Sequence, residues 1–430
     1  MSKSEKILKR LESLHPKQID LSLKRIKVLL KKLGSPEKKL PPTIHVAGTN
    51  GKGSTLAFLR SIFEENNYKV HVYTSPHLIN FNERIRLNSK IITNNFLIEL
   101  LKECEFYNNN EPITFFEITT AAAYLAFSKV PSDVLLLETG LGGRYDATNV
   151  IKTTICSVLT PISMDHMNFL GNSIESITKE KVGIFKQNIP AVISKQSIES
   201  SAIINKESKR KNVKLYECNK FWRISQINPL NFNIQVGEED FSIPTPKLFG
   251  HHQLYNSGTA FIVSKVQNIF KLSDDLTSNG IKKTFWPARM QKIKSGKLKK
   301  IVGENFELWL DGGHNKHASD MLKLNLDIWK KSKLFIIFGM LSNKEPKEFL
   351  DKIINYFTNL YVLPVEGHEY IKSNYLKKIY MNYNQKIIST DKIECALEDI
   401  KNKHKKGKII ICGSLYLAGE VLKKNGTKIT

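Results

Sequence analysis

The sequence has 430 residues, more than one ordinary hydrophobic core accommodates, so we expect two or three domains. Hydrophobic residues make up 41% of the chain, the mean hydropathy is −0.27, and no apolar run reaches the roughly 18 residues that a membrane-spanning helix needs. The composition therefore argues against a membrane protein. The first residues lack the apolar stretch and the cleavage site of a secretory signal, which favours a cytoplasmic enzyme.

The net charge is +24, which raises the possibility of a nucleic-acid partner. However, the chain has 56 lysines and only 9 arginines, and a phosphate-reading surface favours arginine. The basic runs at residues 292–300 and 401–408 contain no aromatic residue on which a base would stack. We interpret the charge as a solvated surface and expect no nucleic-acid partner; a nucleic-acid-binding ATPase is the alternative.

The cysteines are scattered along the chain, odd in number, and never arranged as a CxxC pair. They are Cys104, Cys156, Cys218, Cys395 and Cys412. This pattern predicts buried, reduced thiols rather than disulfides or a zinc site.

Apolar runs that end in glycine or polar residues alternate with helical stretches along the chain. The expected strands are residues 43–47, 69–73, 134–137, 154–159, 191–194, 334–338, 360–363 and 409–411. The expected helices include residues 54–66, 96–104, 118–127, 253–269 and 318–326. Residues 218–249 read instead as short strands of a small antiparallel sheet. Strands that alternate with helices predict an α/β fold with doubly wound parallel sheets.

The best candidate for a domain boundary is the segment 285–289, which a lysine-rich stretch follows. We therefore predict domains at residues 1–286 and 287–430, and the second of these has an ordinary domain size.

A glycine-rich segment, HVAGTNGKGST at residues 45–55, leads from a strand into a helix. Glycines let backbone N–H groups surround phosphate oxygens, the helix N-terminus adds its dipole, and Lys52 adds a positive charge. Ser54 or Thr55 is positioned to reach Mg²⁺. The usual G-x-x-x-x-G-K-[ST] spacing is not met, and the alternative is a plain turn with a surface lysine.

Polar residues follow other predicted strands. Glu138 ends the strand at 134–137, and Asp165 and His166 come soon after the next strand. Because the carboxyl ends of parallel strands meet in one crevice, these residues are candidates for binding Mg²⁺. A surface glutamate and a structural histidine are the alternatives.

The second domain repeats this pattern at Asp311-Gly312-Gly313-His314 and at Gly413-Ser414. The alternative for each is an ordinary glycine turn. Taken alone, the residues indicate an enzyme that uses Mg²⁺ and a nucleotide at a cleft between domains.

Together the motifs resemble the Mur ligase superfamily, and within it the folylpolyglutamate synthase/dihydrofolate synthase family. The matching motifs are HVAGTNGKGST (45–55), YTSPHLINFNERIRLN (73–88), FFEITTAAAYLAF (115–127), LLETGLGGRYDATNV (136–150), MDHMNFLG (164–171), KEKVGIFK (179–186), HHQLYNS (251–257), WPARMQ (286–291), LDGGHN (310–315) and GSLYLA (413–418). The resemblance implies a P-loop ATPase domain followed by a Rossmann-like domain. It also implies that ATP phosphorylates a pteroate or folate carboxylate, after which the amine of L-glutamate attacks the acyl phosphate.

The resemblance further assigns roles to single residues. The ATP-binding loop would be formed by Thr49, Asn50, Gly51, Lys52, Gly53 and Ser54. Two Mg²⁺ ions would be held by Ser75, Glu138 and His166, with Lys181 carbamylated beside them. For Lys181 the alternative is an ordinary surface lysine. Asn256, Arg289 and Asp311 match nucleotide-binding positions, while His314 and Ser414 match positions around the incoming glutamate.

A dihydropteroate site is implied by three segments. They are Ile19, Asp20, Leu21 and Ser22 within the loop 14–22, then Thr114, Phe115, Phe116 and Glu117, and finally Tyr145, Asp146 and Ala147. Phe116 is suited to stack on a pterin and Asp146 to accept from its amino groups, with core packing as the alternative for the phenylalanines. We therefore expect a bifunctional, monomeric enzyme. Folylpolyglutamate synthase activity alone, or another Mur-type amino-acid ligase, are the alternatives.

Overall fold

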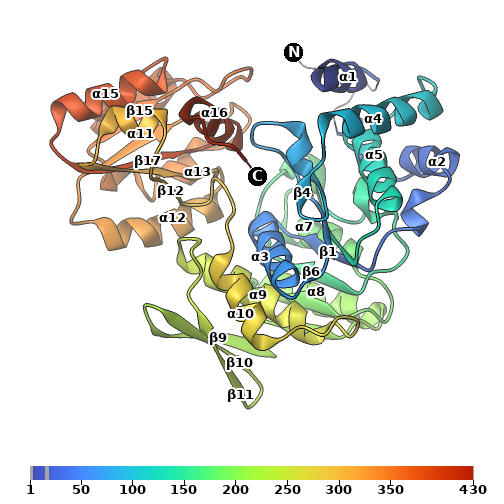
Figure 1. The fold of residues 1–430 in the computed structure, drawn as a ribbon. Coiled ribbons are helices and arrows are strands. Elements are labelled where there is room, and N and C mark those ends of the chain that lie inside the picture. The colour runs from blue at the N-terminus through green and yellow to red at the C-terminus, as the bar shows by residue number, and fades with distance from the viewer. Residues whose placement is uncertain (1–2, 15–18, 430) are drawn as a thin grey trace. The chain divides into compact units, whose positions relative to one another are not determined.

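The computed structural model describes residues 3–14 and 19–429, and Figure 1 labels its helices and strands. Contacts between residues divide the chain into two compact units. The first consists of Met1–His77, Phe81–Lys247 and Leu254–Thr284, and the second of Leu78–Asn80, Leu248–Gln253 and Phe285–Thr430. Two short segments that precede residue 285 thus belong to the second unit, which sequence patterns did not indicate.

In the described part of the first unit, the main sheet has the strand order β4-β3-β2-β5-β1-β6-β7-β8. The strands are β1 (Thr43–Ala47), β2 (Val70–Tyr73), β3 (Ile85–Leu87), β4 (Lys90–Ile91), β5 (Val134–Glu138), β6 (Cys156–Leu159), β7 (Ala191–Ile193) and β8 (Leu215–Glu217). All neighbours from β2 to β8 pair in parallel, whereas β3 and β4 are antiparallel. Every residue of β1, β2, β5, β6 and β7 is buried, as expected for parallel strands covered on both faces.

Some helices of this unit connect successive strands of the sheet, and others pack together in a cluster of their own. The helices are α1 (Lys3–Glu12), α2 (Lys24–Lys32), α3 (Lys52–Glu65), α4 (Asn94–Asn108), α5 (Phe115–Lys129), α6 (Met167–Leu170), α7 (Ile174–Lys181), α8 (Ile198–Arg210) and α10 (Asp274–Lys283), and α9 (His251–Val266) lies mostly within the unit. Helices α1, α2, α4 and α5 pack together (Figure 1). Leu11, Leu29, Leu101 and Tyr124 are among the buried side chains of this cluster.

The antiparallel excursion predicted at residues 218–249 is confirmed. Strands β9 (Trp222–Asn228), β10 (Asn231–Val236) and β11 (Glu239–Pro244) form a separate antiparallel sheet, which Figure 1 draws as a distinct ribbon.

In the second unit, the described strands form a sheet in the order β12-β13-β17-β14-β15-β16. Its elements are β12 (Gln291–Ile293), β13 (Phe306–Leu310), β14 (Leu334–Phe338), β15 (Asn359–Val362), β16 (Ile387–Ser389), β17 (Gly407–Cys412), α11 (Lys297–Val302), α12 (Lys316–Trp329), α13 (Pro346–Leu350), α14 (Ser373–Ile379), α15 (Ile393–Lys403) and α16 (Leu415–Asn425). Strand β12 is antiparallel and the others are parallel. Ile336 and Ile337 of β14 enter different hydrophobic clusters, so the sheet is buried on both faces. The predicted α/β fold with parallel sheets is confirmed.

Four of the cysteines are buried, and burial raises the pKa of the Cys156 and Cys218 thiols to about 12. Cys395 on α15 is exposed, so the expectation of burial is wrong at that position. Among the described helices, none combines the length and the apolar composition needed to cross a membrane.

Candidate functional site

The glycine-rich loop between β1 and α3 packs closely against its surroundings. Gly48 and Gly51 have φ values of +152° and +88°, which residues with a side chain rarely adopt. A Cβ atom at Gly48 would lie 1.9 Å from Thr160 Oγ1, and one at Gly51 would lie 2.6 Å from Asn256 Oδ1. Both positions therefore require glycine, and the loop backbone lies directly beside the end of β6 and beside α9.

The residues between these glycines are fastened to the segment after β6. The N–H groups of Thr49 and Asn50 donate to Pro161 O at 2.9 and 3.2 Å. Thr49 Oγ1 donates to Ser163 O at 3.0 Å, and Asn50 Nδ2 donates to Ser163 Oγ at 3.3 Å. The loop is thereby held in place where α3 begins. The first N–H groups of a helix have no partner within the helix and suit an anion.

Two lysine ammonium groups converge on one carbonyl oxygen of this loop. Lys52 Nζ and Lys181 Nζ donate to Gly48 O at 3.1 and 3.0 Å. Burial, and next the positive charge of Lys52, lower the pKa of Lys181 to about 7. Lys181 is thus a buried amine with an unusually large neutral fraction, and the alternative of an ordinary surface lysine is wrong.

Glu138 lies at the end of β5 and is buried. Its Oε1 is 3.9 Å from Lys52 Nζ, and its Oε2 accepts from Ser75 N at 3.2 Å. His166 adopts a left-handed backbone with φ of +52°, and its Nε2 is 3.9 Å from Asp165 Oδ2. The structure therefore brings Ser75, Glu138 and Lys52 together, while the recorded ion pair of His166 is with its neighbour Asp165. No cluster of three or more His, Cys, Asp or Glu side chains suited to a metal occurs in the described part of the chain.

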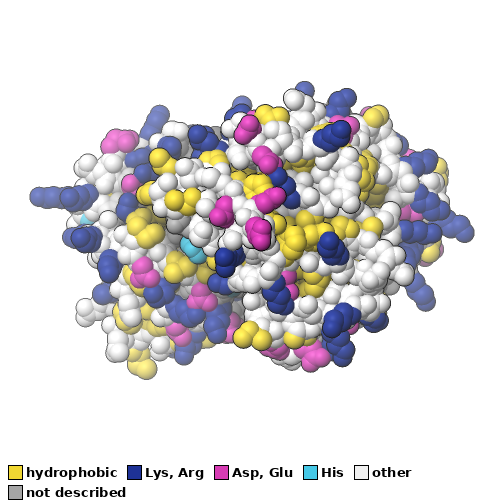
Figure 2. Space-filling model, turned by 90° about the horizontal axis from the view of Figure 1, so that it is seen from below, with side chains coloured by type: hydrophobic (Ala, Val, Ile, Leu, Met, Phe, Trp, Pro, Cys, Tyr) yellow, Lys and Arg dark blue, Asp and Glu magenta, His cyan; other side chains and the backbone are white. Residues whose placement is uncertain are grey.

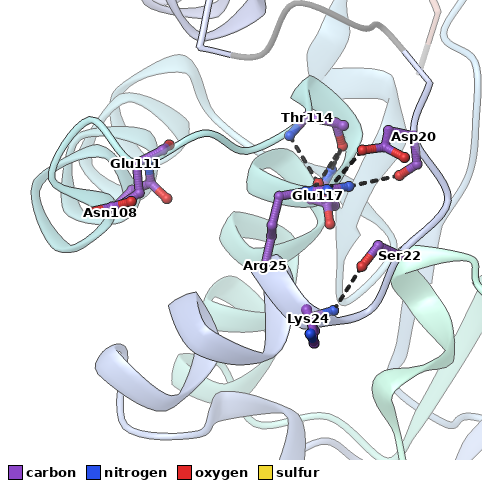
Figure 3. Close-up of polar contacts among 8 residues, drawn as sticks. All are labelled: Asp20, Ser22, Lys24, Arg25, Asn108, Glu111, Thr114 and Glu117. Atoms are coloured by element: carbon purple, nitrogen blue, oxygen red, sulfur yellow. Dashed lines mark hydrogen bonds and ion pairs between the residues drawn. The ribbon is translucent and has the colours of Figure 1, made fainter.

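The first two segments of the predicted dihydropteroate site meet at α5. Thr114 and Glu117 form a capping box at its N-terminus, and Glu117 also pairs with Arg25, which in turn binds Asp20 (Figure 3). The predicted loop 14–22 is described only at residue 14 and from Ile19 onward; residues 15–18 lie outside the described residues. Sequence reasoning missed Arg25. The available signal was an arginine within the lysine-rich run 24–32.

The two predicted phenylalanines differ in what they contact. The Phe81 and Phe115 rings are 5.9 Å apart, edge to face. Phe116 packs over the turn after β5, because a Cβ atom at Gly140 would lie 2.4 Å from Phe116 Cζ. Both phenylalanines are partly buried and pack against the core.

Asp146 is buried within its own loop. Its Oδ2 accepts from Leu141 N at 2.8 Å, and its Oδ1 accepts from Thr148 N at 3.0 Å and from Thr148 Oγ1 at 2.5 Å. Burial raises the pKa of this carboxyl group. Of its neighbours, Tyr145 is 48% exposed and Ala147 is buried, so Tyr145 presents its ring to solvent. The carboxylate of Asp146 holds the loop together and has few lone pairs left for a ligand.

In the second unit, the loops after β13 and β17 lie together, because Gly413 N donates to Gly313 O at 3.1 Å. Asp311 accepts from Gly313 N and Met290 N at 2.7 and 2.9 Å. Ser414 caps α16 by accepting from Tyr416 N at 3.1 Å.

The other two predicted residues of this unit contact backbone carbonyls. His314 Nδ1 is 3.1 Å from Gly312 O, and Arg289 Nη1 donates to Ala288 O at 3.3 Å. Asp311, His314 and Ser414 thus occupy neighbouring strand ends.

Two family models match the chain. The Mur ligase middle domain matches residues 46–264, and the C-terminal domain of dihydrofolate synthetase matches residues 291–424.

Similar proteins extend over nearly the whole length of the chain. A dihydrofolate synthase/folylpolyglutamate synthase of Bacillus subtilis (strain 168) is 31% identical over 424 residues, which cover 94% of each chain. Among solved structures, Escherichia coli FolC in complex with DHPP and ADP has a TM-score of 0.88 at 29% identity, and the match covers 98% of this chain and 97% of that one. A bifunctional folylpolyglutamate synthase/dihydrofolate synthase with Mn, AMPPNP and L-glutamate bound has a TM-score of 0.86 at 29% identity, covering 98% of both chains.

Proposed function

The chain belongs to the dihydrofolate synthase/folylpolyglutamate synthase family of Mur ligases, and we propose that it joins L-glutamate to dihydropteroate and to reduced folates with consumption of ATP. The first reaction gives dihydrofolate and the second gives folate polyglutamates. The observation that carries this proposal is the match of 98% of the chain to a relative solved with DHPP and ADP.

The chemistry proceeds in two steps. An oxygen of the substrate carboxylate attacks the γ-phosphorus of ATP, ADP leaves, and an acyl phosphate forms. The amine of glutamate then attacks the acyl carbon, loses a proton, and displaces phosphate to leave an amide bond. Within the first unit we assign Thr49, Asn50, Gly51, Lys52, Gly53 and Ser54 to the phosphates. Their support is the glycine-dependent turn and the start of α3, where the first N–H groups of the helix lack a partner within the helix and, together with a lysine, would offset negative charge.

The donor set fits Mg²⁺ that is held mainly by phosphates and water. Mg²⁺ commonly takes one or two carboxylates from a protein and keeps several waters. Buried Glu138 supplies one carboxylate beside Ser75, and the described residues offer no larger cluster of metal-ligating side chains. We propose Ser75, Glu138 and His166 as the residues that hold two Mg²⁺ ions. When bound, the ions would neutralise charge on the γ-phosphate and the substrate carboxylate.

We propose that Lys181 carries a carbamate. The ammonium first loses a proton, and the resulting neutral amine adds to the carbon of CO₂ and releases a second proton, so that a cation is converted into an anion. Its pKa of about 7 provides the neutral amine, and an anion there would remove the repulsion with Lys52 across Gly48 O.

For the remaining residues, the resemblance supports the following assignments. Residues 1–286 would bind ATP and the pteridine substrate, and residues 287–430 would deliver glutamate. Asn256, Arg289 and Asp311 are proposed to contact the nucleotide, and His314 and Ser414 the glutamate. The proposed pteridine residues are Ile19, Asp20, Leu21, Ser22, Thr114, Phe115, Phe116, Glu117, Tyr145 and Ala147, and Asp146 is proposed to support this site by holding the loop that carries Tyr145. We further propose a cytoplasmic monomer, whose sedimentation should give the chain mass of 49.1 kDa.

A substrate panel tests the proposal. ATP and L-glutamate are supplied with dihydropteroate, with tetrahydrofolate or with a UDP-muramoyl substrate, and the products are read by mass spectrometry. We expect glutamate addition to the first two substrates only, and no product when ATP or glutamate is omitted. Tetrahydrofolate as the only substrate would leave folylpolyglutamate synthase activity alone, and a UDP-muramoyl product would indicate another Mur-type ligase.

A further inference from the structure

Arg25, in the first turn of α2, bridges two carboxylates from different parts of the first unit (Figure 3). Its Nε donates to Glu117 Oε2 at 2.9 Å, its Nη1 donates to Asp20 Oδ2 at 2.9 Å, and its Nη2 donates to Asp20 O at 2.7 Å. One guanidinium thereby binds a side chain of α5 and both the side chain and the backbone of the segment at residues 19–22. A planar fork of donors is suited to such a bridge, and an ammonium group is not.

The two carboxylate oxygens of Glu117 differ in their hydrogen bonding. Its Oε2 accepts from Thr114 N at 2.9 Å and from Thr114 Oγ1 at 2.7 Å, in addition to Arg25. Its Oε1 is buried and has no hydrogen-bond partner among the described residues. A buried carboxylate oxygen without a donor is costly, and an N–H group of a ligand would satisfy it.

Attaching α2 to α5 does not require this bridge. Ile26, Leu29 and Leu30 of α2 are buried in the cluster that also contains residues of α5. The polar bridge adds what apolar packing lacks, namely a fixed position of the segment 19–22 relative to the start of α5. The end of that segment is also held by a hydrogen bond, because Ser22 Oγ accepts from Lys24 N at 3.2 Å.

We propose that Arg25 is a positioning residue for the pteridine substrate. It holds the segment 19–22 against the capping box of α5, so that Glu117 Oε1 is presented to the N–H groups at the amino-substituted edge of the ring. This inference rests on the proposed function, since it assumes that these two segments line the pteridine site.

Steady-state kinetics with Arg25→Gln and Arg25→Lys test the inference. We expect Arg25→Gln to raise the KM for dihydropteroate at least about tenfold, and Arg25→Lys to raise it less, because a point charge replaces only part of the fork. The KM for ATP should change less than about twofold, and kcat at saturating dihydropteroate less than about threefold. Lys31→Gln, an exposed change on the same helix, is the matched control and should alter none of these values.

A double-mutant cycle separates a specific bridge from general loosening. In a Glu117→Gln background, Arg25→Gln should add less than about threefold to the KM for dihydropteroate, because its partner is already changed. Full additivity of the two effects would overturn the inference.

Other outcomes are also decisive. An unchanged KM for dihydropteroate in folded Arg25→Gln, or an equal rise in the KM for ATP, contradicts positioning of the pteridine. If circular dichroism shows that Arg25→Gln does not fold, Arg25→Lys decides by the same comparison. Direct titration of the unmutated enzyme with dihydropteroate distinguishes the two levels of proposal. If it neither binds nor uses any pteridine, the proposed function fails and this inference with it. If it does and Arg25→Gln binds equally well, only this inference fails.

Discussion

At the scale of single residues, the ammonium groups of Lys52 and Lys181 share the carbonyl oxygen of Gly48. Burial, and next the repulsion between the two like charges, lower the pKa of Lys181. The arrangement becomes favourable when negative charge arrives, either as phosphate beside Lys52 or as a carbamate on Lys181. The two lysines share a partner, and we propose different roles for them.

Replacing Lys52 with alanine should remove charge stabilisation as the γ-phosphoryl group transfers. We expect the rate to fall on the order of 10²-fold or more while circular dichroism remains unchanged. Lys102→Ala, an exposed lysine on α4, serves as the control and should keep full activity. Activity near that of the unmutated enzyme in Lys52→Ala would refute the assignment of the phosphate loop.

Carbamylation of Lys181 should depend on pH. Its pKa is lowered to about 7, so the neutral, reactive amine increases as pH rises through that value. Enzyme depleted of CO₂ should therefore regain activity on adding bicarbonate more completely at about pH 8 than at about pH 6. Lys181→Arg should stay inactive under all these conditions, whereas Lys179→Arg, at an exposed lysine of the same helix, should behave as the unmutated enzyme. A fully active Lys181→Arg would exclude the carbamate.

The same shift has a consequence for stability. While Lys181 is unmodified, its folded-state pKa lies below the unfolded value, so the unfolded chain binds more protons between about pH 7 and 10.5. Its contribution to stability therefore increases as pH rises through that window.

At the scale of elements, the turn between β5 and β6 is organised by one buried carboxylate. Asp146 accepts from Leu141 N, Thr148 N and Thr148 Oγ1, while Thr148 Oγ1 is 2.9 Å from His45 Nε2 on β1. These contacts connect the strand before the phosphate loop to the loop that carries Tyr145. A change at Asp146 should consequently disturb more than a single ligand contact.

We expect Asp146→Ala to lower the free energy of unfolding by about 1–3 kcal/mol, because buried donors lose their acceptor. Glutamylation of dihydropteroate and of reduced folates should then fall together. Asp133→Ala is the control, since the carboxylate of Asp133 accepts from Lys69 N at an exposed site where water replaces it. Thermal unfolding and both activities are measured. Selective loss of dihydrofolate synthesis in a fully stable Asp146→Ala would instead indicate a direct contact with the pterin.

At the scale of the whole molecule, the net charge of +24 is the main feature in favour of a different function, namely nucleic-acid binding. On the face shown in Figure 2, lysine and arginine side chains occur together with acidic and apolar ones. Many basic residues also form ion pairs, such as Lys283 with Glu65 and Lys352 with Asp320. This mixture is typical of a solvated surface rather than a track for a phosphate backbone.

ATP turnover should require a pteridine substrate and glutamate, and should not be stimulated by DNA or RNA. Turnover is measured at low and moderate salt with and without each nucleic acid, because electrostatic binding would weaken steeply with salt. Nucleic-acid-stimulated turnover that disappears on adding salt would support the competing interpretation.

The sequence by itself determined several strands and the glycine-rich turn after β1, because both depend on local sequence patterns. Strands β1 and β14 begin and end where their apolar runs do, at Thr43–Ala47 and Leu334–Phe338. Gly48 and Gly51 predicted a turn, and the φ values and close neighbours of that turn require glycine at both positions. Patterns of this kind depend on residues near one another in the chain.

Only the tertiary structure decided which side chains share a charge environment. The pKa of Lys181 depends on burial and on Lys52, which lies 129 positions earlier in the chain (181 − 52). The bridge made by Arg25 depends on the packing of α2 against α5. Cys395 is exposed because it lies on the face of α15 opposite to the buried residues of that helix. Burial and long-range charge have no local signature in the sequence, since they arise only when distant segments are brought together by folding.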